Sequence, residues 1–358
     1  MIMNGVGKVR TLKVLIYWEE KKEVSKDKKR IIGIDFLKII ACLGVVGLHT
    51  IGKDSSTINR ILYYFCGYAI PIFFMVHGYL LLNKDNLNYK YLIHKAITFL
   101  CVAFLWNCAI MIIQIILYKS IINPLKETLR EIVVQRGFFF QFWYFGALFL
   151  VYLVAPFLYK ILHSSKRVQF GIILLAIVVI IDILSIYFSK TVGEPLQSRI
   201  SQPFRIWTWI FYFYSGGLIK KLNIQIDNKS RKILFFLLIS IIVNSVYDYF
   251  VGYKIIGIEW AEYYYDNIFM ICESVLLFIT FNGIKIDNIR INHIISSVSS
   301  LIMGVFVIHV MVIKVIEKCY NFQNSIYNLI LWFVVFLISL IISKIVSCIP
   351  ILKGLIKL

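Results

Sequence analysis

The chain has 358 residues, of which 60% are hydrophobic and 16% aromatic, and its mean hydropathy is positive. This composition is too apolar for a soluble domain and indicates a membrane protein, whose main partner is the lipid bilayer. The formal net charge of +19 lies in short basic runs between apolar stretches, which is typical of a polytopic protein and excludes a nucleic-acid-binding role.

Ten apolar stretches are long enough to cross a bilayer, which requires roughly 20 residues. They lie near 31–51, 61–82, 96–118, 139–162, 168–188, 203–219, 231–252, 263–283, 294–316 and 325–349. We therefore expect an all-α, polytopic transmembrane helical bundle of about ten spans within residues 31–349. Lys and Arg are concentrated in alternate loops on the N-terminal side, which predicts that both termini are cytoplasmic.

The two ends of the chain are predicted to be cytoplasmic tails. Residues 1–30 are basic and lack the small-residue cleavage site of a signal peptide, and residues 350–358 form a short C-terminal tail. The seven cysteines lie mostly inside apolar stretches and lack metal-ligand spacing, so we expect neither a disulfide framework nor a metal site.

The first predicted span carries ionisable residues on one face. Lys38 and His49 are separated by about three helical turns, or roughly 16 Å, and Asp35 precedes Lys38 at a spacing that allows the two to pair. Such groups are costly in a membrane unless they face protein or water, so the span fits the wall of a cleft. The other interpretation is that Asp35 and Lys38 only neutralise each other and that His49 ends its helix among lipid headgroups.

Further ionisable residues lie at comparable depths in other spans. The predicted orientation places His309 and Arg205 at the outer side with His49, and His77 in the inner half with Lys38. Two histidines at one level suit proton transfer near neutral pH. We expect the carboxylates within the bundle to accept interhelical hydrogen bonds; these are Asp182, Asp248 and Glu273.

Four motifs in order resemble those of the acyltransferase 3 family, integral membrane enzymes that acylate cell-surface carbohydrates. In "IDFLKIIACLGVVGLH", the family's basic residue and histidine fall on Lys38 and His49. The others are "PIFFMVHGYLLL", "FWYFGALFLVYLVAPFL" and "SSLIMGVFVIHVMV", and "FYFYSGGLIKKL" fits the glycine-containing end of a middle span. The resemblance extends from about residue 31 to residue 345.

The resemblance implies an O-acyltransferase, most simply an O-acetyltransferase, in a bacterial cell membrane. Acetyl-CoA in the cytoplasm would donate an acyl group to a hydroxyl of a surface polysaccharide or its lipid-linked precursor, and glycan-synthesis proteins would be partners. His49 is assigned as general base. Lys38 either orients Asp35 or stabilises charge on the acyl carbonyl oxygen, so these three form the predicted catalytic set.

Two positions depart from the family pattern. His77 stands where the family usually has Ser, and "YLIHKAITFL" offers only Lys95, with Leu92 at the partner position, where many members carry two arginines. Lys90 and His94 are nearby cations for the donor phosphates. The predicted substrate-binding residues are Arg205, His309, His77 and Lys95.

Two other functions fit the same sequence. In an exporter of polysaccharide or lipid-linked sugar, the buried charges would line a translocation route. A catalytically silent membrane subunit of a glycan synthase is the other alternative. The aromatic runs "WTWIFYFY" and "EWAEYYYD" suit stacking on sugar rings, although aromatic residues crowd membrane interfaces in any case.

Overall fold

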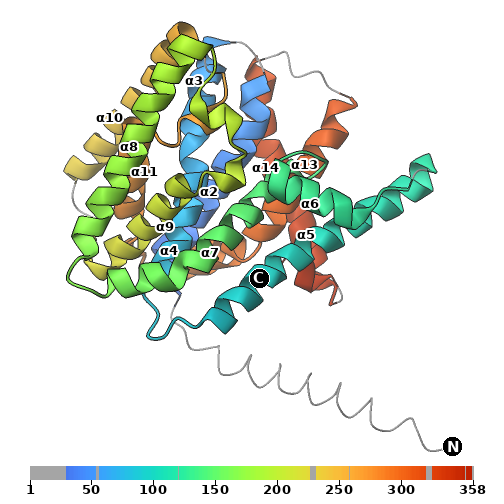
Figure 1. Ribbon diagram of the computed structural model, residues 1–358. Helices are drawn as coiled ribbons and strands as arrows, with labels where there is room; N and C mark the ends of the chain where they lie inside the picture. The colour runs from blue at the N-terminus through green and yellow to red at the C-terminus, as the bar shows by residue number, and fades with distance from the viewer. Residues whose placement is uncertain are drawn as a thin grey trace, which may run out of the picture. The chain divides into compact units, whose positions relative to one another are not determined.

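The computed structural model describes residues 30–53, 56–119, 121–225, 231–257, 259–319, 325–350 and 352–356. Residues 32–358 form one compact unit, and the predicted tail 1–30 lies outside the described residues except for Arg30. Every regular element of the described residues is a helix, which confirms the all-α class (Figure 1).

Thirteen longer helices follow one another in this unit. They are α2 (Ile32–Thr50), α3 (Thr57–Phe65), α4 (Ala69–Leu81), α5 (Tyr89–Tyr118), α6 (Pro124–Val134), α7 (Trp143–Leu162), α8 (Arg167–Val192), α9 (Ile206–Lys221), α10 (Arg231–Tyr247), α11 (Ile268–Phe281), α12 (Ile289–Ser299), α13 (Ile302–Glu317) and α14 (Ser325–Cys348). Short 3₁₀ turns connect several of them, and the π-helix η6 (Asp248–Ile256) extends α10.

Each of the ten predicted spans coincides with one of these helices or with a pair of them. Within the described residues, seven stretches are long and apolar enough to cross a membrane, and an eighth is obtained if α12 and α13, which are bent by 56°, count as one span. The helices α9 and α11 have only 16 and 14 residues. The total of ten spans and the side on which the termini lie remain predictions.

Helix α2 lies in the interior of the bundle and contacts α4, α11, α12, α13 and α14 (Figure 1). Its neighbour α4 crosses α9 so closely that each helix has a glycine where the other's backbone passes. A Cβ on Gly78 would overlap the carbonyl of Phe213, and one on Gly216 would overlap the carbonyl of Met75. Small residues permit this kind of approach between membrane helices, so α4 and α9 form a tightly packed pair beside α2.

The amphipathic helix α6 lies in the segment 119–138, which connects the predicted spans 96–118 and 139–162. Asn123 caps its N-terminus by accepting bonds from the N–H groups of Leu125 and Lys126, and proline occupies its first position. The helix ends at Gln135, whose φ of 58° is left-handed. This turn sends the chain towards α7 and places the Gln135 side chain at the site described below.

Candidate functional site

The predicted ion pair at the start of α2 is present. Nζ of Lys38 lies 3.1 Å from Oδ1 of Asp35, which also accepts a hydrogen bond of 2.7 Å from the hydroxyl of Ser299. Asp35 is buried, whereas the Lys38 side chain is 29% exposed. Ser299 ends α12 at the bend before α13, so Asp35 ties α2 to this bend.

His77 and Lys95 belong to the same region as Lys38. Nδ1 of His77 lies 2.7 Å from the hydroxyl of Tyr152, and the charges of Lys95 and Lys38 both act on the His77 ring. Lys90 and His94 are exposed. Lys38 and Lys95 thus lie near enough to His77 for their charges to act on its ring, whereas Lys38 itself bonds to Asp35.

His49 lies near the other end of α2, stacked against His309 of α13. The ring centroids are 5.3 Å apart and the planes differ by 23°, and Phe140 packs edge-on against His49 at 5.1 Å. His309 is fully buried; its Nδ1–H donates to the carbonyl of Val305, 3.1 Å away, and its Nε2 has no hydrogen-bond partner. This arrangement leaves an unprotonated acceptor nitrogen within the histidine pair.

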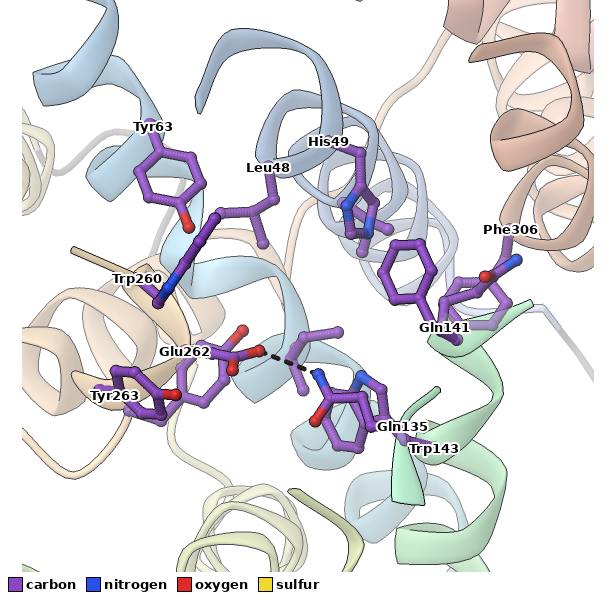
Figure 2. Close-up of a pocket in the computed structure, with 14 residues that line it drawn as sticks. Leu48, His49, Tyr63, Gln135, Gln141, Trp143, Trp260, Glu262, Tyr263 and Phe306 are labelled. Carbon is purple, nitrogen blue, oxygen red and sulfur yellow. Dashed lines mark hydrogen bonds between the residues drawn. The ribbon is translucent and has the colours of Figure 1, made fainter. Parts of the chain in front are cut away.

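A cavity of about 270 Å³ opens beside His49. Figure 2 shows His49 on one side of it and Trp260 and Glu262 on another. Its wall is aromatic with a few polar groups, a composition common in ligand pockets. The lining residues are Val45, Leu48, His49, Tyr63, Ile70, Gln135, Phe140, Gln141, Trp143, Trp260, Glu262, Tyr263, Tyr265 and Phe306.

One wall of the cavity is the segment 259–266, whose backbone is bound by side chains from neighbouring helices. Tyrosine hydroxyls and one guanidinium make these bonds, at 2.7–3.1 Å. They join Tyr64 to the carbonyl of Glu259, Tyr63 to the N–H of Ala261, Arg205 to the carbonyl of Glu262 and Tyr212 to the carbonyl of Tyr265. The wall is therefore preorganised.

The Glu262 carboxylate faces Gln135 across the cavity. Nε2 of Gln135 donates to Oε2 of Glu262 at 2.9 Å, the bond drawn in Figure 2. Gln141 also lines the cavity; its Nε2 donates to the carbonyl of Val307 at 3.4 Å, while its Oε1 is buried without a partner. Amide and carboxylate groups at the wall of an aromatic cavity provide hydrogen bonds for a hydroxyl-rich ligand.

Arg205, predicted to bind substrate, lies behind this wall and does not line the cavity. Its three guanidinium nitrogens donate to the carbonyls of Ile200, Glu262 and Gln197 at 2.7–3.0 Å, and the guanidinium lies over the Tyr263 ring. In the structure it supports the Glu262 wall, and its contact with substrate remains a prediction.

Several residues of the cavity could not be identified from the sequence alone. Gln135 and Glu262 lie in short connecting segments, where hydrophobic periodicity gives no information, and Gln141 lies in a 3₁₀ turn at the start of the predicted span 139–162. The run "EWAEYYYD" did indicate an aromatic segment here, and "NPLKETLREIVVQRG" has the cap, proline and final glycine of a short helix. Two predicted interhelical bonds are present, from Asn267 to Asp248 and from Asn244 to Glu273.

Within the described residues, no group of three or more His, Cys, Asp or Glu side chains is arranged to hold a metal ion. The cavity thus offers a histidine, one carboxylate, amides and aromatic rings.

Comparison with known proteins gives one family match. A family model described as an acyltransferase domain matches residues 31–349. A curated amino-acid racemase of Enterococcus faecalis is 22% identical over 335 residues, which cover 85% of this chain and 44% of the racemase. The chain thus spans less than half the length of this relative. No solved structure matches.

Proposed function

Because the chain belongs to the acyltransferase family whose model matches residues 31–349, we propose that it is an O-acyltransferase, most simply an O-acetyltransferase. The donor is cytoplasmic acyl-CoA, and the acceptor is a hydroxyl of a cell-surface polysaccharide or its lipid-linked precursor. The observation that carries the proposal is the position of His49, stacked on His309 at the wall of an aromatic cavity. The site of action is the bacterial cell membrane, with glycan-synthesis proteins as partners.

In the proposed reaction the acceptor hydroxyl enters the cavity and His49 removes its proton, because a neutral imidazole is a suitable base near neutral pH. The hydroxyl oxygen then bonds to the thioester carbonyl carbon, the carbon–sulfur bond breaks, and the thiolate leaves. The proton held by His49 passes to that thiolate. The products are an ester on the sugar and free CoA.

The donor approaches from the other end of α2. Lys38 and Lys95 supply positive charge there for the phosphates of the donor. Since Lys38 and His49 are roughly 16 Å apart along the helix, they do not act on the same atom. An extended donor arm, or a relayed acyl group, spans this separation.

The test is the ester-linked acyl content of surface glycans from cells that lack the gene, complemented with wild type or with His49→Ala. We expect esters to vanish in the deletion, return with wild type and stay absent with a normally abundant His49→Ala protein. An unchanged ester content contradicts the proposal. Glycan accumulating inside the deletion cells would then favour the exporter.

A further inference from the structure

The charge of the cavity wall is unbalanced. Among the described residues that line it, Glu262 is the only carboxylate and neither lysine nor arginine is present. Two arginines contact the wall segment from outside the cavity: Arg205 uses Nε, Nη1 and Nη2 on backbone carbonyls, and Arg60 pairs with the Glu259 carboxylate. An anionic ligand would therefore meet a carboxylate without a compensating lining cation.

The aromatic and carboxylate groups indicate what the cavity does accept. Trp143, Trp260 and Tyr263 present ring surfaces, and the half-buried Glu262 carboxylate is a hydrogen-bond acceptor. A ligand with apolar faces and hydroxyl donors at its edge satisfies both kinds of group. The volume of about 270 Å³ is slightly below the roughly 300–1,000 Å³ of sites for drug-sized ligands, which suits a single sugar ring.

On the basis of the proposed function, we propose that this cavity binds one uncharged sugar residue of the acceptor and that Glu262 accepts hydrogen bonds from its hydroxyls. The same carboxylate excludes uronic acids and phosphorylated sugars, because a second anion in a partly desolvated cavity is repelled strongly. Gln135 holds one oxygen of Glu262 in place through the 2.9 Å bond. Glu262 is thereby a specificity-determining residue for the acceptor.

The experiment identifies the sugar residue that carries the ester and replaces the Glu262 carboxylate. Cells lacking the gene are complemented with wild type, Glu262→Gln or Glu259→Gln, and mass spectrometry of their envelope glycans identifies and quantifies the residue that carries the ester. Glu259→Gln is the matched control: it is the same substitution in the same segment, but this side chain pairs with Arg60 outside the cavity.

We expect the wild-type ester on an uncharged sugar residue, at least a tenfold loss of ester with Glu262→Gln, and a wild-type level with Glu259→Gln. An ester on a uronic acid or a phosphorylated sugar overturns the inference, as does full esterification by Glu262→Gln. If Glu262→Gln does not accumulate, the identity of the wild-type acylated residue still decides the substrate class. Equal ester content with and without the gene contradicts the proposed function itself, a result distinct from the others.

Discussion

The imidazole rings of His49 and His309 are stacked with their centroids 5.3 Å apart, although the two residues come from helices near opposite ends of the chain. His49 borders the cavity, whereas His309 is buried behind it with its Nε2 unpartnered. The pair therefore consists of one histidine that lines the cavity and one that contacts the first.

His309→Phe tests whether the second ring acts only by packing. Phenylalanine keeps an aromatic ring against His49. It loses the bond from Nδ1–H to the Val305 carbonyl but also removes the buried Nε2 that has no partner, so stability should change little. We expect acyl transfer to fall about 10- to 100-fold, because a nitrogen that assists proton transfer is lost. Initial rates at equal protein abundance measure the effect, and a wild-type rate would show that stacking alone is required.

Lys38→Ala tests the ion pair on α2. It removes the positive charge beside the buried Asp35, which also accepts a bond from Ser299, and we expect a loss of about 1–3 kcal/mol of stability together with loss of acyl transfer. The control is Lys314→Ala, which breaks an i,i+3 pair of the same length, 3.1 Å, at an exposed position. Such a pair contributes about 1 kcal/mol or less. Thermal unfolding in detergent measures both, and equal destabilisation would contradict the structural role of Asp35.

Gln135→Gly tests whether the Gln135 side chain is needed for acyl transfer, because glycine removes the side chain and also relieves the backbone strain at this position. A non-glycine residue with a φ of 58° costs roughly 1–2 kcal/mol, so glycine relaxes the backbone and offsets the loss of the bond to Glu262. We expect stability equal to or above that of wild type, with reduced acyl transfer.

Lys119→Gly is the matched control, because Lys119 also ends a helix in the left-handed conformation, with a φ of 51°, and is exposed. It should raise stability and leave the rate unchanged. A fully active Gln135→Gly variant would mean that orienting Glu262 is unimportant.

The stability of the protein should depend on pH through Glu131 of α6. Burial raises the pKa of Glu131 from 4.5 to about 6, while hydrogen bonds from Asn107 and from the N–H of Phe139 act in the opposite direction. The folded state therefore binds the proton more tightly than the unfolded chain. The stability contributed by Glu131 is fully present below pH 4.5 and is lost as the pH rises through about 6, by about 2 kcal/mol for this shift.

Unfolding temperatures between pH 4.5 and pH 7 measure this dependence. Glu131→Gln cannot titrate and should remove this part of the slope. An identical pH profile in wild type and Glu131→Gln would exclude Glu131 as the source.

Local spacing was sufficient to predict the features that lie on one helix. The interval of three residues predicted the pair of Asp35 and Lys38, and the orientation of alternating spans placed His309 at the level of His49. Contacts made by the segments that connect the helices could not be predicted from local spacing. Arg205 was expected to bind substrate, but its observed bonds go to carbonyls of segments 197–200 and 262, and a carbonyl has no residue-specific signature.

The helix α6 illustrates a second reason. Its apolar face is short, and it lies among basic residues between two long spans. The amino-acid composition of this segment therefore did not indicate a membrane-spanning helix. Glu262 was not distinguished either, because nothing in the spacing of the three acidic residues of the run "EWAEYYYD" shows which one lines a cavity. The family motifs include the helix that carries His49, but none of them includes the segment 259–266 that forms the cavity wall.

Neighbouring side chains bind the segment 259–266 at four backbone groups, the carbonyls of residues 259, 262 and 265 and the N–H of residue 261, and also at the carboxylates of Glu259 and Asp266. Its path thus depends little on which side chains stand at 260 and 262. The backbone of the wall is held in place, whereas the side chains at positions 260 and 262 can be exchanged. Exchanging Trp260 and Glu262 should retarget the enzyme to other acceptors without rebuilding the bundle, which makes this segment the natural place for acceptor preference to diverge.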